Sequence, residues 1–193
     1  KAVPSVTWIC GEYPKGIGFY KWLAEKGWDE AEAIKNAAGE KGSKVHQAIG
    51  DVIKGKEVKI DSKYKNPKTG QLEELTLEEC DCILSFVNCK NKTEPITLLW
   101  ETSIVGDLFG GTIDYVYRLK DDPENTIHLL DFKTGQYIWD EYKLQLSAYK
   151  SLLAGSVSKG DIILKGINPK QNLNIMTEIL QVGYKRNKDN YKL

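Results

Sequence analysis

The sequence predicts a mixed α/β (α+β) fold, in which helices flank one mixed β-sheet. Three observations lead to this prediction. The first 92 residues show mainly the helical spacing of apolar side chains. From residue 96 the spacing changes to the alternation typical of strands, repeated three times with turn residues between. An amphipathic helix and two further strand-like runs follow, and this order places helices against a sheet.

The first half of the chain is expected to begin with a short extended segment and to continue as helices. Glycines and the loop NPKTGQ at 66–71 supply the breaks between elements. The expected elements are the extended segment 4–10, helices over 16–28 and 29–55 interrupted by glycines, and a helix over 75–90.

The second half is expected to form a three-stranded meander, then a helix, then two more strands. The turn KDDPEN separates the second and third strands, and NPKQN separates the last two. The expected strands are 96–105, 111–119, 126–132, 161–167 and 174–182, and the expected helix is 138–155, ending at Gly155.

Length and composition favour one globular domain over 1–193, with a helical part, 1–92, and a sheet-bearing part, 93–193. Hydrophobic residues make up 41% and charged residues 28%, which is ordinary for a water-soluble protein. No apolar run approaches the about 20 residues of a membrane-spanning helix, and the N-terminus lacks a signal-peptide pattern. We therefore expect no membrane partner.

The formal net charge of zero excludes a basic field over the whole protein. Any nucleic-acid partner must then be held by a local patch. Two lysine-rich stretches, 54–68 and 184–192, are available, and each by itself fits an ordinary solvated surface.

The four cysteines, at 10, 80, 82 and 89, do not follow the C-x2-C spacing of a zinc site. Cys82 and Cys89 would share one face of a helix, which favours buried free thiols in a reducing, intracellular compartment. Lys1 is not an initiator methionine, so the N-terminus does not fix the localisation.

The strand-like run 126–132 ends in charged side chains that a core strand does not need. Alternation places Ile127, Leu129, Asp131 and Lys133 on one face, and both faces are otherwise apolar. The D-x-K spacing therefore places an acid and an amine side by side at the exit of a buried strand. A salt bridge exposed to solvent would explain the pair equally well.

The preceding strand supplies a second acid. Asp114 interrupts an apolar and aromatic run, and a hairpin across KDDPEN would bring it near Asp131. Two carboxylates brought together in a buried place repel each other, and a divalent cation relieves the repulsion. Oxygen ligands suit Mg²⁺ or Mn²⁺.

Two further polar residues lie on predicted helices. His46 lies on an apolar stripe, where it is either a core histidine or a ligand. Gln145 occupies a position at which a core helix would carry leucine, so its amide needs a partner. That partner is either a neighbouring backbone group or the substrate and the active-site lysine.

These motifs resemble those of the PD-(D/E)xK nuclease superfamily. GGTIDYV, LLDFKTG and QLSAY follow the G-x-x-D, D-x-K and Q-x-x-x-Y motifs of the RecB-type branch, and the likeness covers about 4–153. KGSKVHQAI is similar to the helical histidine segment of phage-encoded and mitochondrial genome maintenance exonucleases. The resemblance implies a restriction-endonuclease-like core.

The resemblance also implies a role for each matched residue. Glu101, in LLWETSIV, is similar to an upstream acid of several members and fits a surface strand residue equally well. The implied sets are the catalytic residues Asp114, Asp131 and Lys133; the metal ligands His46, Asp114, Asp131 and the Phe132 backbone carbonyl, with Glu101 as a further candidate; and the substrate-binding or bracing residues Gln145 and Tyr149.

The function expected from these residues is a metal-dependent deoxyribonuclease, acting as an exonuclease on single-stranded DNA or duplex ends. The aromatic residues near the site, Tyr137, Trp139 and Tyr142, would either stack bases or pack the helix start. No iron–sulfur cluster is expected, because no cysteine follows Cys89. The alternatives are a structure- or sequence-specific endonuclease, or a nucleic-acid-binding or assembly module with a vestigial site. Oligomeric state is left open.

Overall fold

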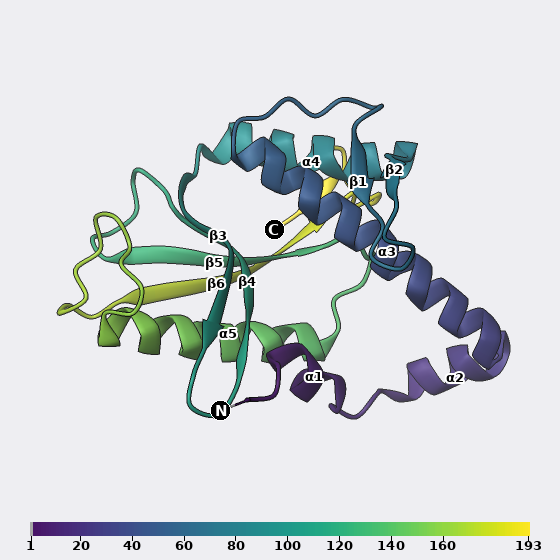
Figure 1. Ribbon diagram of the computed structural model, residues 1–193, viewed down its shortest axis with the longest axis horizontal. Coiled ribbons are helices and arrows are strands. Elements are labelled where there is room, and N and C mark those ends of the chain that lie inside the picture. The colour runs from purple at the N-terminus through teal and green to yellow at the C-terminus, as the bar shows by residue number, and fades with distance from the viewer. Residues whose placement is uncertain (1) are drawn as a thin grey trace.

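The computed structural model describes residues 2–193 and has three layers (Figure 1). A five-stranded mixed sheet lies between α5 on one face and α3 with α4 on the other (Figure 1). The helices are α1 (Val6–Gly11), α2 (Ile17–Lys26), α3 (Trp28–Ile53), α4 (Leu77–Thr93) and α5 (Asp140–Lys159). The strands are β1 (Lys63–Lys65), β2 (Leu72–Glu74), β3 (Ile96–Val105), β4 (Gly110–Arg118), β5 (Thr126–Lys133), β6 (Asn174–Val182) and β7 (Tyr191–Lys192).

The strand order in the main sheet is β3-β4-β5-β6-β7. β3, β4 and β5 form the expected antiparallel meander, and β6 pairs with β5 in parallel after the α5 crossover. β5 therefore lies in the centre of the sheet and is buried along nearly its whole length. The mixed α+β class predicted from the sequence is confirmed.

Each face of the sheet has its own apolar core, as the alternation in β5 predicts. Ile127 and Leu129 face α5, while Leu130 and Phe132 face α3 and α4. The α5 side also contains Val6, Ile113, Val116, Leu146, Tyr149 and Leu153. The α3 and α4 side contains Val45, Ile49, Cys82, Phe86, Cys89, Tyr115 and Tyr117. Cys82 and Cys89 are buried as free thiols, and burial raises the pKa of each to about 11.

Three predictions for the helical segments differ from the structure. The extended segment predicted at 4–10 is instead helix α1, whose start is capped by the Ser5 hydroxyl accepting from the Trp8 N–H. The last helix continues past Gly155 to Lys159 and ends at Gly160, whose φ of 80° suits glycine. Similarly, α3 continues through its internal glycines.

The predicted strand 161–167 does not form. Residues 161–167 are irregular, and the loop that follows them is held by the Asn125 side chain, which donates to the carbonyls of Asn168, Gln171 and Asn172. The Asn125 side-chain oxygen Oδ1 accepts from the Asn168 N–H at 2.8 Å. These side-chain bonds satisfy backbone groups of the loop before β6.

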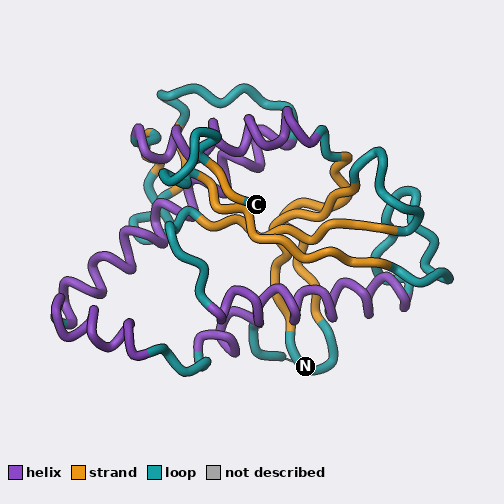
Figure 2. The backbone as a smooth tube through the Cα atoms, turned by 180° about the vertical axis from the view of Figure 1, so that it is seen from behind, coloured by secondary structure: helices purple, strands orange, loops and turns teal. Residues whose placement is uncertain are grey.

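α2 and the first half of α3 stand away from the sheet, as the view from behind in Figure 2 also shows. α2 has no buried residue, and between Trp28 and Gly39 only Ala31 of α3 is buried. None of the helices in the described part of the chain is both long and apolar enough to cross a membrane.

Candidate active site

Asp131 and Lys133 lie side by side where β5 leaves the sheet. Lys133 Nζ is 2.5 Å from Asp131 Oδ2, with the two side chains 18% and 3% exposed. Among residues 2–193, Lys133 is the charged partner of this buried oxygen, which accepts no other hydrogen bond. The pair is thus a buried ion pair, not the solvent-exposed salt bridge that the sequence left open.

Asp114 is on the adjacent strand and faces the same end of β5. The last registered pair of β4 and β5 is Tyr115 with Leu130, and one step further Asp114 would stand opposite Asp131. There the ladder ends, because the Asp114 carboxylate accepts the Phe132 N–H at 3.0 Å in place of a backbone carbonyl. The two acids predicted to meet across the hairpin do lie on neighbouring strands.

His46 reaches this place from α3. Its Nε2 lies 3.3 Å from the Phe132 carbonyl oxygen, which can only accept. In the neutral ring this leaves Nδ1 unprotonated, and Nδ1 lies 3.8 Å from Asp114 Oδ2. His46 is therefore a half-buried residue at the edge of the core, directed at the two acids.

The buried charges shift the pKa of Asp131 and of Lys133. Burial, together with the nearby Asp114 charge, raises the pKa of Asp131 to about 6, although Lys133 opposes this shift. Burial alone would lower the pKa of Lys133, but Asp131 and Asp114 outweigh it and raise the pKa above its ordinary value. Lys133 is consequently an ammonium at neutral pH.

Glu101 stands near the acids by register but not by contact. Trp100 pairs with Tyr115 and Thr102 with Ile113, which places Glu101 of β3 opposite Asp114 of β4. Its φ of 40° is uncommon for a residue with a side chain, and a strand interior is an unusual place for it. Glu101 is exposed, and its carboxylate makes no ion pair with the rest of residues 2–193.

Gln145 and Tyr149 contact each other on α5. The Gln145 amide donates to the Tyr149 hydroxyl at 3.0 Å, so its partner is neither a backbone group nor Lys133. Tyr149 is buried against Gly111 of the G-x-x-D motif, where an added Cβ would lie 2.6 Å from the tyrosine ring. The Q-x-x-x-Y and G-x-x-D motifs are thus packed together beneath the candidate site.

The aromatic partner of Lys133 is Tyr142, which the sequence indicated only as a stacking or packing residue. Lys133 Nζ lies 4.6 Å from the centre of the Tyr142 ring. Tyr142 occupies the first turn of α5, so the contact depends on how the loop after β5 returns to the helix. Spacing along the sequence carries no signal for it.

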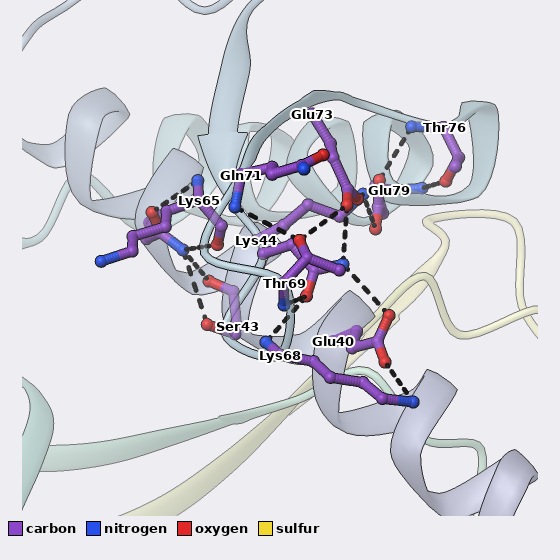
Figure 3. A network of polar contacts seen from close by, with 12 residues as sticks. Glu40, Ser43, Lys44, Lys65, Lys68, Thr69, Gln71, Glu73, Thr76 and Glu79 are labelled. Carbon is purple, nitrogen blue, oxygen red and sulfur yellow. Dashed lines mark hydrogen bonds and ion pairs between the residues drawn. The ribbon is translucent and has the colours of Figure 1, made fainter.

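A buried polar network fixes α3 near His46 (Figure 3). Lys44 Nζ lies 3.1 Å from Glu79 of α4 and 3.5 Å from Glu73 of β2. Both Lys44 and the Glu79 side chain are almost fully buried. Asn66 joins the same network by donating to Glu40 and Glu73, and Gln47 pairs with the Lys65 backbone. The β1–β2 hairpin and α4 together hold the segment that carries the histidine.

The donors at this place suit a hard divalent cation in type. Two carboxylates, a backbone carbonyl and one imidazole nitrogen lie at this place, and one buried Asp131 oxygen is paired with the Lys133 ammonium. Among residues 2–193, however, no three side chains of the His, Cys, Asp and Glu types are already arranged to hold an ion. Metal binding here would need side-chain rearrangement, above all separation of Lys133 from Asp131.

A scan against protein-family models and a search of curated proteins each found no match to this chain. The interpretation of the site therefore depends on its geometry and on the motifs.

Proposed function

We propose that this protein is a metal-dependent deoxyribonuclease that acts as an exonuclease on single-stranded DNA or on DNA ends. The observation that supports it most is the meeting of Asp114, Asp131 and Lys133 at the exit of β5, where the Lys133 ammonium is paired with a buried Asp131 oxygen. A packed core gains nothing from two acids and an amine at this position. The motif resemblance supports the same chemistry.

The residues would share the work of phosphodiester hydrolysis. Asp114, Asp131, the Phe132 carbonyl and His46 would hold Mg²⁺ or Mn²⁺, which lowers the pKa of a bound water and shields phosphate charge. Lys133, an ammonium because of the neighbouring acids, would contact the scissile phosphate as a fixed cation and stabilise its developing negative charge. Tyr142 and the Gln145–Tyr149 pair would keep Lys133 and α5 in position.

The test is cleavage of an end-labelled single-stranded oligonucleotide with Mg²⁺, Mn²⁺ or a chelator. We expect metal-dependent cleavage by the wild type and a loss of about 100-fold or more in Asp114→Ala and in Lys133→Ala. Lys170→Ala, an exposed lysine on the loop before β6, is the matched control and should cleave normally. Cleavage that survives both site substitutions would place the chemistry elsewhere.

Circular single-stranded DNA separates the exonuclease from an endonuclease. An exonuclease needs an end, so the circle should stay intact under conditions that digest the linear strand. Cutting of the circle would favour the endonuclease. A wild type that cleaves neither DNA nor RNA with either metal would favour a binding module with a vestigial site.

A further inference from the structure

The loop between β5 and α5, residues 134–139 (the site loop), is bonded to the basic residues 184–188 (the basic segment), which follow β6. The Gln136 amide donates to the Gly183 carbonyl at 2.9 Å, and its oxygen accepts from the Lys185 N–H. From the end of β6, Gln181 donates to the Gly135 carbonyl at 2.9 Å. A segment that looked like solvated surface in the sequence is therefore fixed beside Lys133.

An aromatic side chain and a guanidinium meet where these two segments touch. The Arg186 guanidinium lies 5.2 Å from the centre of the Tyr137 ring and donates to the Tyr137 hydroxyl at 3.2 Å. Trp139 is adjacent, with ring centres 6.4 Å apart. Tyr137 and Trp139 remain 60% and 49% exposed, so packing does not account for them.

The charge of the basic segment is available to a ligand. Lys185, Arg186 and Lys188 are all exposed. Lys185 is held by Glu78 at 3.4 Å, whereas Arg186 pairs with no carboxylate of residues 2–193. In a protein of zero net charge, this is a local group of basic side chains on a segment that is hydrogen-bonded to the site loop.

We propose that Tyr137 and Arg186 form a docking surface for single-stranded nucleic acid, with a base stacked on Tyr137 and a phosphate bound by Arg186. This inference rests on the proposed nuclease function, because it names where the strand lies next to the cleavage site. Exposed aromatic rings stack on any unpaired base, and arginine recognises phosphate through its fork of N–H donors. Paired bases in a duplex offer no free face to Tyr137, so a single strand is the ligand that fits.

The experiment measures equilibrium binding of a labelled oligothymidylate of about 20 nucleotides by the full chain in EDTA, where cleavage is blocked. We expect Tyr137→Ala to weaken binding by about 5- to 150-fold, and Tyr137→Phe, which keeps the ring, to weaken it far less. Arg186→Ala should weaken binding and reduce the slope of log affinity against log salt by about 0.7, the loss of one single-strand phosphate contact. Lys170→Ala, remote from the site loop, should change neither quantity.

Tyr137→Ala should leave duplex binding, measured with blunt DNA of equal length, nearly unchanged relative to the wild type, because paired bases cannot stack on the ring. Equal affinities of Tyr137→Ala, Arg186→Ala and wild type for the single strand would overturn the inference. That result in a wild type that cleaves DNA would leave the proposed function standing. Conversely, binding that depends on both residues in a wild type that cleaves nothing would support the docking surface and remove the nuclease.

Discussion

At the scale of single residues, Gly111 and Tyr149 show how a missing side chain joins two motifs. The tyrosine ring occupies the space that a Cβ at position 111 would need, and the ring in turn holds Gln145 through its hydroxyl. Tyr149 also belongs to the core beneath β4 and β5. The glycine is therefore needed for packing under the site, independently of any contact with substrate.

Gly111→Ala should lower the free energy of unfolding by about 1–3 kcal/mol, because the added methyl overpacks the site against Tyr149. Chemical denaturation of this variant and of a control variant measures the change in unfolding free energy. Gly155→Ala is the matched control, since nothing lies within 4 Å of its Cβ position and it sits inside α5. That variant should gain about 0.5–1 kcal/mol. An unchanged stability for Gly111→Ala would mean that Tyr149 can move aside.

Residues whose position follows from strand alternation could be placed from the sequence. Asp131 and Lys133 share a face of β5, and Asp114 lies across the hairpin, because strand period and turn position fix both relations. The partner of Gln145 could not be deduced, since an amide accepts many partners and the choice depended on where Tyr149 packs. The Lys133–Tyr142 contact depends on a loop conformation that no periodicity describes.

At the scale of elements, α3 carries His46 and is fixed by Lys44, a charged residue inside the protein. The partner Glu79 also forms the capping box of α4 with Thr76, so one carboxylate serves two elements. Removing one member of a buried pair leaves an uncompensated charge, which costs far more than an exposed pair is worth.

Glu79→Ala should lower the free energy of unfolding by about 3–5 kcal/mol. Its neighbour Glu78, which pairs with Lys41 and Lys185 at the surface, provides the control. Glu78→Ala should cost far less than Glu79→Ala, because the pairs that Glu78 forms are exposed to solvent and screened. Urea or guanidinium titration measures the free energy of unfolding of both variants. Equal decreases would show that the buried pair contributes no more stability than a surface pair.

The predicted elements differ from the observed ones where side chains, and not the backbone, are the hydrogen-bonding partners. The apolar run 161–167 reads as a strand, but Asn125, distant in sequence, binds the carbonyls of the loop that follows it. The Ser5 side chain caps the start of α1, and the prediction of an extended segment did not include this cap. The strands of the meander were well placed, because each combines alternation with strong flanking turns.

At the scale of the whole molecule, the three-layer body contrasts with α2 and the first half of α3, which stand away from it. Every strand of the meander contributes to the buried cores, whereas α2 contributes no buried residue. Local stability follows buried apolar contacts, so the two parts should open independently.

Backbone amides of α2 should exchange with solvent deuterium well before those of β5, which is buried and paired on both sides. Hydrogen exchange followed by mass spectrometry of peptides covering 17–26 and 126–133 gives the comparison. Protection of α2 equal to that of β5 would indicate that another surface covers this helix in solution.

The mixed sheet also sets an order of folding. The β4–β5 hairpin closes over a short turn, whereas β5 and β6 must close a loop in which Thr126 and Asn174 are 48 positions apart. Closing a long loop costs entropy before its contacts can form, so parallel pairing is the slow event. Asp114 and Asp131 should therefore be neighbours early, when β5 still has an open edge. A nascent chain that stalls before β6 would leave β5, with Asp131, as an unpaired edge strand prone to aggregation.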